Sequence, residues 1–525
     1  MSTTIHFHPE LPVRLQQLQK VLTQCQQMME SGRSSELYAF AWYEEKLSYV
    51  VEAGRTVNTS ESKDKGIVLR ILCDGVQYES ASNNLKEESI LELAAELRRT
   101  VDTKHPQTQQ KAYLPTTWHQ ELAVGLPTEL EQQIPPHATQ DTPVHFAPAC
   151  AMDPEKITIA DLLQRVQAYR DQALALANQV NPQLDGASRI ADVQLMARFR
   201  MTYNLFVDRE KNMSQVLPMS VIGGGGVTTT GQSLRVTKGG LGTLELIDMD
   251  EADFNDMAVV PQELSCAEKI KPGRYKVITG PAISGVIAHE AFGHTQEGDT
   301  WMKGRSIARD LHASRTRVGN EHATIMNNPA IFSMEGQQAG CNGSYFFDNE
   351  GQLARPQTIL AQGYLSTPMT DLTSALELNA PRTANGKRES WRRPLMTRQT
   401  NTYFTPGDKT LEELITLVDE GFMAVAPRGG MEDPKGGSLT AGAAYFEEIK
   451  KGQLTGRKFI GPAGGHIELT DSVFDVLDRI EAKTGVTHAD KTPAVKLGGC
   501  GKYHKELVDA GVGGPYILWS SINCG

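Results

Sequence analysis

Apolar side chains near the start of the chain recur at helical spacing, and further on they alternate with polar ones. Residues 12–30 predict an amphipathic helix, because apolar positions fall three or four residues apart at Leu15, Leu18, Leu22, Cys25 and Met29. Alternation over 37–51 and 66–79 predicts strands, and 87–99 predicts a second helix. This order of helix, strands and helix indicates an N-terminal α/β domain over residues 1–100.

The periodic pattern weakens over residues 101–150, which are rich in Pro, Gln and Thr. We expect a linker or an extended insertion there. A middle region, 151–265, begins with a long helix near Thr158, where TIAD forms a capping box, and continues as strands over 190–250. The four-glycine run 223–226 interrupts these strands, and we interpret it as a flexible connection.

The last region, 266–525, is punctuated by glycine and rich in strand-like patterns, with few helices. One helix is expected from Thr410, where TLEE makes another capping box. The predicted fold class is therefore α+β: an N-terminal α/β domain followed by a strand-rich, antiparallel C-terminal domain that carries the helix of a metal site. A division into domains is expected for 525 residues, because single cores stop growing at about 250–300 residues.

Composition and charge exclude several classes of function. Hydrophobic residues make up 39% and charged residues 22% of the chain, as in ordinary globular proteins. The net charge of -11 and the lack of a long basic run argue against a nucleic-acid partner. No apolar run approaches the length that spans a bilayer, so we expect no membrane partner.

The cysteines and the N-terminus indicate a reducing compartment. Seven cysteines are scattered without a pattern, which argues against a disulfide framework. The opening MSTTIHFHPELPVRLQQ lacks the charged-then-apolar order of a secretory signal. The expected location is the cytoplasm.

Candidate chemistry lies in the stretch ITGPAISGVIAHEAFGHTQEGD, residues 278–299. Ser284 is the expected helix cap, and His289, Glu290 and His294 follow on a segment of small and apolar residues. Buried His and Glu side chains need partners. A metal ion supplies a common partner to the two histidines, and Glu290 can hold a metal-bound water.

The spacing H-E-x-x-x-H is one residue longer than the H-E-x-x-H of zinc peptidase helices. Five residues of a regular α-helix rotate by ~500°, which leaves the two histidines ~140° apart. A π-type turn accommodates the extra residue, and Gly293 lowers the cost of a bend there. The motif thus predicts either a metal pair on a locally widened turn or a helix end with two satisfied histidines.

A third metal ligand is needed, because catalytic zinc usually takes three protein ligands and a water. Glu297 lies three residues past His294, and Cys500 lies among glycines in LGGCGKYH. The residue types alone do not rank these two, although a lone Cys is more often a small buried hydrophobe. His504 is a weaker candidate, for which a surface position is the favoured interpretation.

Several blocks of sequence resemble one known family. They are HEAFGHTQEGD, ANGKRESWRRPLMTRQTNTYFTPGD at 384–408, FFDNEG at 346–351 and the C-terminal GGCGKYHKELVDAGVGGPYILWSSINCG at 498–525. Together with the strands at 37–79, they resemble the TldD branch of the TldD/PmbA family of metallopeptidases. The resemblance covers nearly the whole chain except 101–150. Two features depart from the family pattern: the ending WSSINCG, and KYH after the cysteine block.

The resemblance implies a site and an activity. Its zinc ligands are His289, His294 and Cys500, with Glu290 as the general base, and Glu297 then orients a ligand or binds substrate. The implied function is a zinc-dependent peptidase that cleaves small or unfolded peptides, with a zinc-bound water as the nucleophile. Strand-rich walls suit an extended peptide that docks by main-chain pairing.

The resemblance also implies a partner. Family members work as dimers, so we expect a heterodimer with an inactive PmbA/TldE-type paralogue, or a homodimer. The rival hypotheses are a non-catalytic peptide-binding or regulatory subunit of such a protease, and a regulator of another protein. The inactive paralogues lack the H-E-x-x-x-H ligands that this chain carries, which argues against the first rival.

Overall fold

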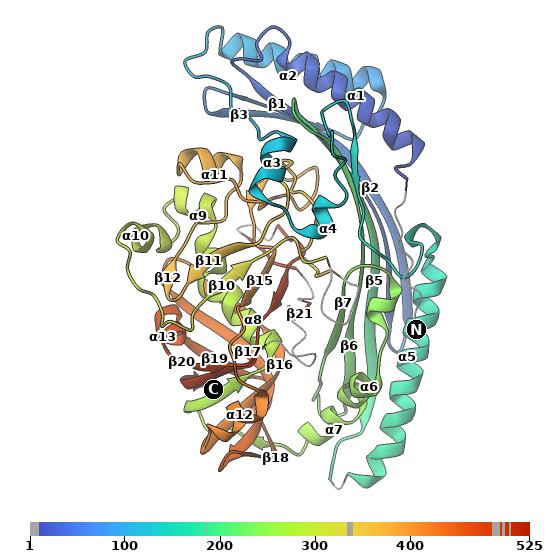
Figure 1. The fold of residues 1–525 in the computed structure, drawn as a ribbon. Helices are drawn as coiled ribbons and strands as arrows, with labels where there is room; N and C mark the ends of the chain where they lie inside the picture. The colour runs from blue at the N-terminus through green and yellow to red at the C-terminus, as the bar shows by residue number, and fades with distance from the viewer. Residues whose placement is uncertain (1–9, 185, 333–339, 486–493, 496–498, 503–505) are drawn as a thin grey trace.

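The structure is a computed structural model of the whole chain, and it describes residues 10–184, 186–332, 340–485, 494–495, 499–502 and 506–525. The N-terminal half is built around one long, curved sheet (Figure 1). Its strand order is β3-β2-β1-β5-β6-β4, with β7 paired to β6. The strands are β1 Tyr38–Ala53, β2 Val57–Cys73, β3 Val76–Ser82, β4 Val144–Phe146, β5 Ile190–Val207, β6 Asn212–Thr228 and β7 Val236–Leu241.

Helices cover one face of this long sheet (Figure 1). The long ones are α1 Val13–Glu30, α2 Glu87–Lys104 and α5 Ile159–Val180, and their apolar faces join the sheet in one core. The predicted helices at 12–30 and 87–99 are confirmed. The capping box at Thr158 is also confirmed, since the Thr158 hydroxyl accepts from the Asp161 amide at 3.3 Å and the Asp161 carboxylate accepts from the Thr158 amide at 2.8 Å.

The glycine run 223–226 does not form a flexible connection, and that prediction is wrong. It lies inside β6, between β5 and β7. Gly224 has a φ of 145°, and a Cβ there would lie 2.0 Å from the main-chain oxygen of Gln194. A Cβ on Gly225 would lie 2.0 Å from the oxygen of Leu234. Glycine is therefore needed because neighbouring backbones approach closely.

The segment 101–150 carries short elements, α3 Trp118–Val124, α4 Thr128–Glu131 and β4, which pairs with β6. The long sheet itself takes strands from both sides of this segment, because β1 pairs with β5 over thirteen positions from Ala41↔Val207 to Ala53↔Leu195. The domain boundaries at residues 100, 150 and 265 stay a prediction. Short helices α6 Glu251–Ala258 and α7 Val260–Leu264 lead into the C-terminal half.

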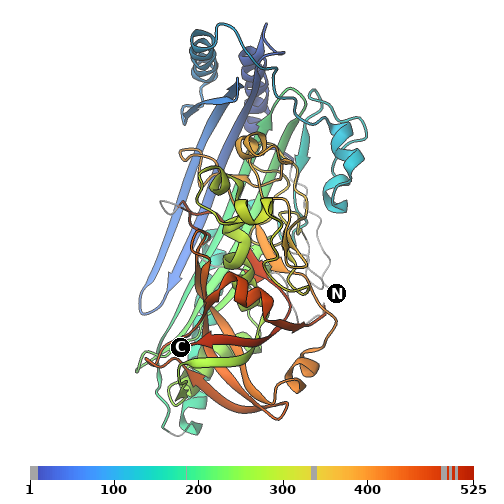
Figure 2. The same ribbon diagram turned by 90° about the vertical axis from the view of Figure 1, so that its left-hand side faces the viewer.

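Two smaller sheets build the C-terminal half (Figures 1 and 2). The C-terminal sheet has the order β16-β9-β23-β19-β17-β18-β8, with β20 on β23, and most of its pairs are antiparallel. Its strands are β8 Glu268–Lys269, β9 Gly273–Thr279, β16 Glu420–Asp433, β17 Ser438–Lys450, β18 Gln453–Ile460, β19 Ile467–Ser472, β20 Ile480–Lys483 and β23 Ile517–Cys524. The small sheet runs β12-β11-β10-β15-β22-β21. Its strands are β10 Ile325–Asn327, β11 Gln357–Ala361, β12 Tyr364–Leu365, β15 Asn401–Phe404, β21 Ala494–Val495 and β22 Gly511–Gly513.

The remaining elements of this half are short. They are the hairpin β13 Gly386–Lys387 and β14 Met396–Thr397, and the helices α8 Pro281–Ala288, α9 Gly298–Met302, α10 Ala308–Ala313, α11 Leu372–Glu377, α12 Leu411–Thr416 and α13 Val473–Asp478. The capping box predicted at Thr410 is confirmed, since its hydroxyl accepts from the Glu413 amide at 3.1 Å. The predicted α+β class, with a mostly antiparallel C-terminal region, is confirmed.

The second face of the long sheet packs on the C-terminal half. Buried aromatic side chains meet there, among them Trp42, Phe206 and Phe347. An ion pair between Arg70 of β2 and Glu350 crosses the same boundary. The cavities described below therefore lie between segments that are distant in sequence but firmly packed.

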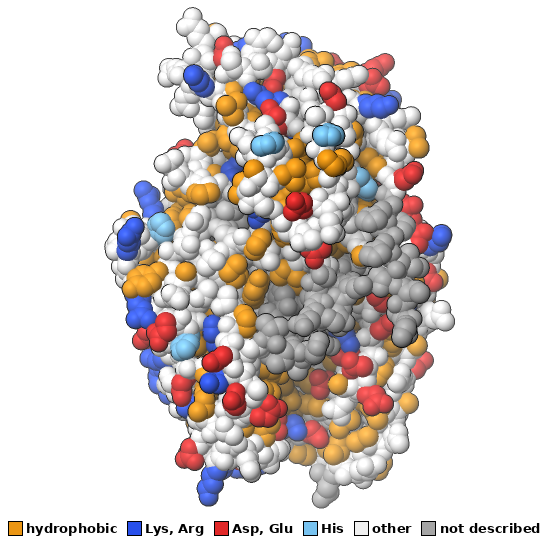
Figure 3. Space-filling view, viewed as in Figure 1, with side chains coloured by type: hydrophobic (Ala, Val, Ile, Leu, Met, Phe, Trp, Pro, Cys, Tyr) orange, Lys and Arg blue, Asp and Glu red, His pale blue; other side chains and the backbone are white. Residues whose placement is uncertain are grey.

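Two further observations concern the surface charge and the hydropathy of the helices. On the face drawn in Figure 3, Lys and Arg side chains are interspersed with Asp and Glu and form no single basic patch. Among the described helices, none is both long and apolar enough to cross a membrane. None of the seven cysteines, all of which are among the described residues, forms a disulfide.

Candidate metal centre

The histidine motif lies at the end of a buried helix between the C-terminal sheet and the small sheet. Strand β9 ends at Thr279, and Pro281 occupies the first turn of α8, where its missing N–H is not needed. The helix therefore begins before Ser284, and the predicted cap at Ser284 is wrong. Its hydroxyl instead lies 2.7 Å from that of Thr279 and is fully buried.

The predicted widened turn is present. Residues His289–Gly293 form a π-helical turn directly after α8, and a 3₁₀ turn from His294 follows. In a π-turn, positions i and i+5 are neighbours, and the rings of His289 and His294 lie 4.9 Å apart. A Cβ on Gly293 would lie 2.0 Å from the side-chain oxygen of Gln399. The Gln399 amide donates to the carbonyl of His289 at 3.2 Å, so it supports the turn.

Cys500 reaches both histidines from the C-terminal segment. Its Sγ lies 3.2 Å from His289 Nε2 and 3.2 Å from His294 Nε2. The three potential ligand atoms all lie within 4.8 Å of one another. Because Cys500 is 2% exposed and His289 is fully buried, water competes little for these donors.

The main chain around Cys500 is fixed by two interactions. Cys500 and Val508 pair across a narrow antiparallel bridge, with N–O distances of 2.8 and 3.1 Å. The buried guanidinium of Arg398 donates to the carbonyl of Cys500 at 2.5 Å and to that of Glu506 at 2.8 Å. Arg398 therefore holds the loop on which the thiol stands.

The side chains of this cluster shift one another's pKa values. Burial alone would raise the pKa of the Cys500 thiol, but the His294 and His289 rings hold it well below its usual value. Burial alone would lower the pKa of His294, but the Cys500 thiolate and the Glu297 carboxylate raise it well above its usual value. These shifts favour a thiolate beside a protonated ring in the metal-free cluster, and a divalent cation would take the place of the proton.

The donor set fits a tetrahedral ion of the zinc type. Zinc–sulfur bonds of about 2.3 Å and zinc–nitrogen bonds of about 2.0–2.1 Å give tetrahedral edges of about 3.3–3.6 Å. The two observed sulfur–nitrogen distances of 3.2 Å are close to these edges. One thiolate and two imidazoles leave one position open, which is the arrangement of catalytic rather than structural zinc sites.

Glu297 lies behind His294 and not among the facing donors. Its Oε2 is 3.3 Å from His294 Nδ1, on the opposite edge of the ring from the nitrogen that faces Cys500. Lys502 Nζ lies 2.9 Å from Glu297 and 2.5 Å from Asp299, and also donates to Thr397 O. Although burial opposes it, Lys502 and His294 hold the pKa of Glu297 well below its usual range. This carboxylate orients the ring, as such residues do around metal-binding histidines.

Glu290 faces a cavity of about 640 Å³ together with His294, Cys500 and β16. Strand β16 approaches it so closely that a Cβ on Gly430 would lie 2.9 Å from Glu290 Cγ. Glu432 of β16 lines the same cavity and accepts a hydrogen bond from the Thr295 hydroxyl. Burial raises the pKa of Glu432 well above its usual value, and the negative charge of Glu290 adds to this.

Sequence reasoning missed three contributors to this site: Gln399, Lys502 and Glu432. The first two lie inside blocks that resemble a known family, but their contacts depend on tertiary packing that no local pattern reveals. Glu432 lies in the glycine-rich stretch RGGMEDPKGG, near the end of β16. The weaker candidate His504 lies outside the described residues.

Comparison with known proteins identifies the family. Residues 272–525 match the family described as PmbA/TldA metallopeptidase C-terminal domain. Residues 272–525 belong to the TldD/PmbA family. The resemblance inferred from the sequence blocks is therefore confirmed for the family.

Two curated relatives illustrate the match. A metalloprotease of Methanocaldococcus jannaschii is 32% identical over 249 residues, 47% of this chain and 50% of that protein. A zinc metalloprotease TldD homolog of Saccharolobus solfataricus is 30% identical over 256 residues, 49% of this chain and 52% of that protein. The chain spans about half the length of the curated relatives it matches.

A solved structure extends the likeness to the whole fold. TldE from Thermococcus kodakarensis superposes with a TM-score of 0.63, covering 97% of this chain and 99% of that one, at 13% sequence identity. At this identity the likeness concerns the fold alone. The long sheet and the C-terminal half thus share the overall arrangement of that structure.

Proposed function

We propose that this chain is a zinc-dependent peptidase whose ligands are His289, His294 and Cys500. The observation that carries the proposal is the convergence of two histidine nitrogens on one thiol, beside a cavity that Glu290 lines. The names of the curated relatives as metalloproteases support it.

The chain's own residues provide the remaining chemistry. When bound, zinc polarises a carbonyl group and lowers the pKa of a water ligand. Glu290 is adjacent to His289 in the π-turn and 3% exposed, and it accepts a proton from water in the cavity and passes it to the leaving amine. The thiolate of Cys500 contributes a negative charge that a third histidine would not, so it tempers the charge of the metal.

An extended peptide is the substrate that this site suits. The cavity of about 640 Å³ accommodates a few side chains but not a folded domain. Strand β16 borders it at a bulge, where the pairing with β17 shifts register between Pro427 and Gly430. Such a bulge presents main-chain groups to a passing strand. Small or unfolded peptides are thus the proposed substrates.

Replacement of Glu290 by Gln tests the proposal. The variant Glu290→Gln should retain zinc and bind peptide, while cleavage of an unstructured peptide falls by on the order of 10²-fold or more. His289→Ala should lose both zinc and cleavage. Glu61→Gln, at an exposed position of β2, is the control and should leave both unchanged. Cleavage at the native rate by Glu290→Gln would remove its role as general base.

A second chain is part of the proposal. TldE of Thermococcus kodakarensis shares the fold, and we propose a heterodimer with a PmbA/TldE-type paralogue, or a homodimer, in the cytoplasm. Light scattering of the chain alone and with a co-expressed paralogue measures this. A monomer with full activity would contradict it, and a chain that binds peptide but never zinc would favour the alternative of a non-catalytic subunit.

A further inference from the structure

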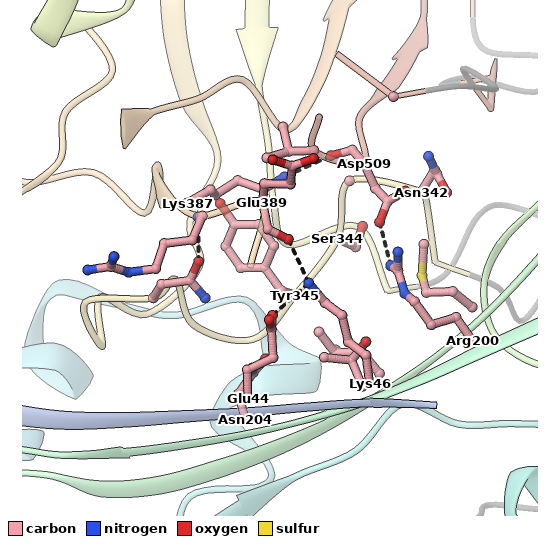
Figure 4. Close-up of a pocket in the computed structure, with 18 of the residues that line it drawn as sticks. Glu44, Lys46, Arg200, Asn204, Asn342, Ser344, Tyr345, Lys387, Glu389 and Asp509 are labelled. Carbon is pink, nitrogen blue, oxygen red and sulfur yellow. Dashed lines mark hydrogen bonds and ion pairs between the residues drawn. The ribbon is translucent and has the colours of Figure 1, made fainter. Parts of the chain in front are cut away.

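A second cavity, of about 340 Å³, lies between the long sheet and the C-terminal half. Strands β1, β5 and β6 form its floor, and the segments around Tyr345, Lys387 and Asp509 form its roof (Figure 4). Gly499, the neighbour of Cys500, lines both this cavity and that of the metal centre. The two cavities therefore adjoin each other at this residue.

Three cationic side chains surround one carboxylate in this second cavity. Arg198 Nη2 lies 3.1 Å from Asp509 Oδ1, and Arg200 Nη2 pairs with Asp509 Oδ2. Lys387 Nζ donates to the main-chain oxygen of Asp509 at 2.8 Å and lies 5.2 Å from the centre of the Tyr345 ring. Within the part of the chain that the structure describes, no carboxylate pairs with Lys387.

Two more cations, Lys46 and Arg388, and three carboxyl groups, Glu44, Asp348 and Glu389, line the rest of this cavity. Lys46 lies 2.8 Å from Glu44 and donates to the main-chain oxygen of Glu389 at 2.8 Å, as Figure 4 shows. The excess of positive charge is thus concentrated around Asp509. Consistent with this, burial and the nearby guanidinium groups of Arg398 and Arg200 lower the pKa of Lys387 to about 8, although Asp509 opposes them.

Several hydrogen-bond donors on the floor of the cavity lack an acceptor. Arg198, Arg200 and Thr202 occupy alternate positions of β5, so they share one face of the sheet. Among the described residues, the Nε atoms of both arginines and the hydroxyl of Thr202 are buried without a hydrogen-bond partner. Thr202 is only 5% exposed. Buried donors in such a row call for an acceptor that the chain itself does not supply.

We propose that this second cavity binds the free C-terminal carboxylate of a peptide substrate, through Arg198, Arg200 and Lys387. The proposal rests on the proposed function in that it takes the substrate to be a peptide. A carboxylate accepts from guanidinium and ammonium groups in charge-assisted hydrogen bonds, and it supplies the charge that the cluster lacks. Asp509 positions the two guanidinium groups from the side.

The site is adjacent to the reacting centre along the main chain. Cys500 pairs with Val508, and Asp509 is the next residue. The carboxylate site and the metal centre are thus neighbours on one stretch of main chain, and the proposal takes a peptide whose end is bound beside Asp509 to present residues close to that end to the metal centre. The structure thus favours cleavage near the C-terminus over cleavage in the middle of long peptides.

Matched peptides test this preference. The probe is an unstructured peptide in three forms: free C-terminal acid, C-terminal amide, and amide with Asp as the last residue. Amidation should lower kcat/KM by about 10- to 100-fold, the loss of one or two charged hydrogen bonds, with most of the change in KM. The Asp-amide form should not recover the rate, since its carboxylate hangs from a side chain. Mass spectrometry should find short C-terminal fragments first.

Variants assign the preference to the cluster. Lys387→Gln leaves both arginine–Asp509 pairs in place, and Arg200→Gln removes one of them. In each variant, kcat/KM for the free-acid peptide divided by kcat/KM for the amide should fall toward one. The control Arg99→Gln, at an exposed position of α2, should leave this ratio unchanged. Equal kcat/KM for acid and amide by the unaltered protein would overturn the proposal. The proposal would also be overturned if Lys387→Gln and Arg200→Gln both kept the full preference for the free-acid peptide.

A binding measurement separates this proposal from the peptidase function. Calorimetry of chelator-treated protein with the acid and amide peptides needs no catalysis. The zinc-loaded protein is assayed for cleavage in parallel. Tighter binding of the acid by the chelator-treated protein, with no cleavage by the zinc-loaded protein, would contradict the peptidase function and support the carboxylate site. Cleavage together with equal binding of both forms would do the reverse.

Discussion

Two clusters of this protein bring histidine and cysteine together, and they differ in what the ring nitrogens face. In both His289–His294–Cys500 and Cys73–Asp74–His105, the potential ligand atoms lie within 4.8 Å of one another. In the first, two Nε2 atoms converge on one sulfur at 3.2 Å. Their lone pairs can share one ion.

The second cluster satisfies its own donors and acceptors. His105 Nδ1 lies 3.1 Å from Asp74, and its Nε2 lies 2.9 Å from the Tyr78 hydroxyl. Burial and the charge of Asp74 raise the pKa of the Cys73 thiol, whereas the pKa of Cys500 is lowered. Proximity of ligand types is thus insufficient for a metal site; the donors must point at a common centre and the thiol must ionise.

The largest expected difference follows from removing one sulfur at a time. Cys500→Ala should weaken zinc binding by on the order of 10²–10³-fold, one ligand's share of the ~10–16 kcal/mol that a full set provides. Cys73→Ala should leave zinc content unchanged. Elemental analysis and competition with a chromogenic chelator measure both. Zinc loss in Cys73→Ala with retention in Cys500→Ala would reverse the comparison.

A smaller effect is expected at the carboxylate that orients His294. Glu297→Gln should lower zinc affinity by about 10- to 100-fold, yet bind one equivalent at saturating metal, because Glu297 contacts the ring nitrogen that faces away from Cys500. Glu321→Gln, at an exposed position, is the control. Complete and irreversible loss of zinc would make Glu297 the third ligand in place of Cys500.

The local parts of the metal centre were predictable from sequence. The five-residue spacing of His289 and His294 predicts a widened turn because regular α-helical geometry cannot align them. Capping boxes at Thr158 and Thr410 predict their helices because the interaction spans only three residues. The prediction of a cap at Ser284 was wrong because Pro281 can begin a helix one turn earlier.

The tertiary parts were not predictable from the residues alone. Cys500 is separated from His294 by 206 positions, and no periodicity ranks it above Glu297, which is three positions away. Only the family resemblance did so. The prediction of a flexible connection at the glycine run 223–226 was wrong for a similar reason. The main chains of Gln194 and Leu234 lie against these glycines, and only the strand pairing shows this. The ligand roles themselves stay predictions.

The pH dependence of zinc binding sharpens the comparison further. In the metal-free cluster the raised pKa of His294 keeps its ring protonated near neutral pH, and zinc requires the neutral ring. Zinc affinity should therefore rise with pH throughout the range below the raised pKa of His294 and level off above it. The increase should be up to about tenfold per pH unit for each proton released.

Calorimetry in buffers of different ionisation enthalpy measures that proton release directly. The binding enthalpy should vary with the buffer in the unaltered protein and in Cys73→Ala alike. An enthalpy independent of the buffer would mean that His294 is already neutral, and the thiolate–imidazolium pair would be wrong.

The smallest expected effect tests whether the second cluster is purely structural. Asp74 has a φ of 49° and accepts from the amides of Gln109 and Gln110 at 2.9 Å each. Asp74→Ala should lose about 1–2 kcal/mol of stability through these bonds, and lower the thermal midpoint by about 1 °C for each kcal/mol, because the shift shrinks as chain length grows. Asp74→Asn keeps an acceptor and tolerates positive φ, so its midpoint should fall less.

Zinc content should be unchanged in both variants of Asp74, because His105 binds Asp74 and Tyr78 and not a metal. A loss of zinc in Asp74→Ala without loss in His294→Ala would show that the ion occupies the second cluster, and the distinction drawn from the direction of the ring nitrogens would fail.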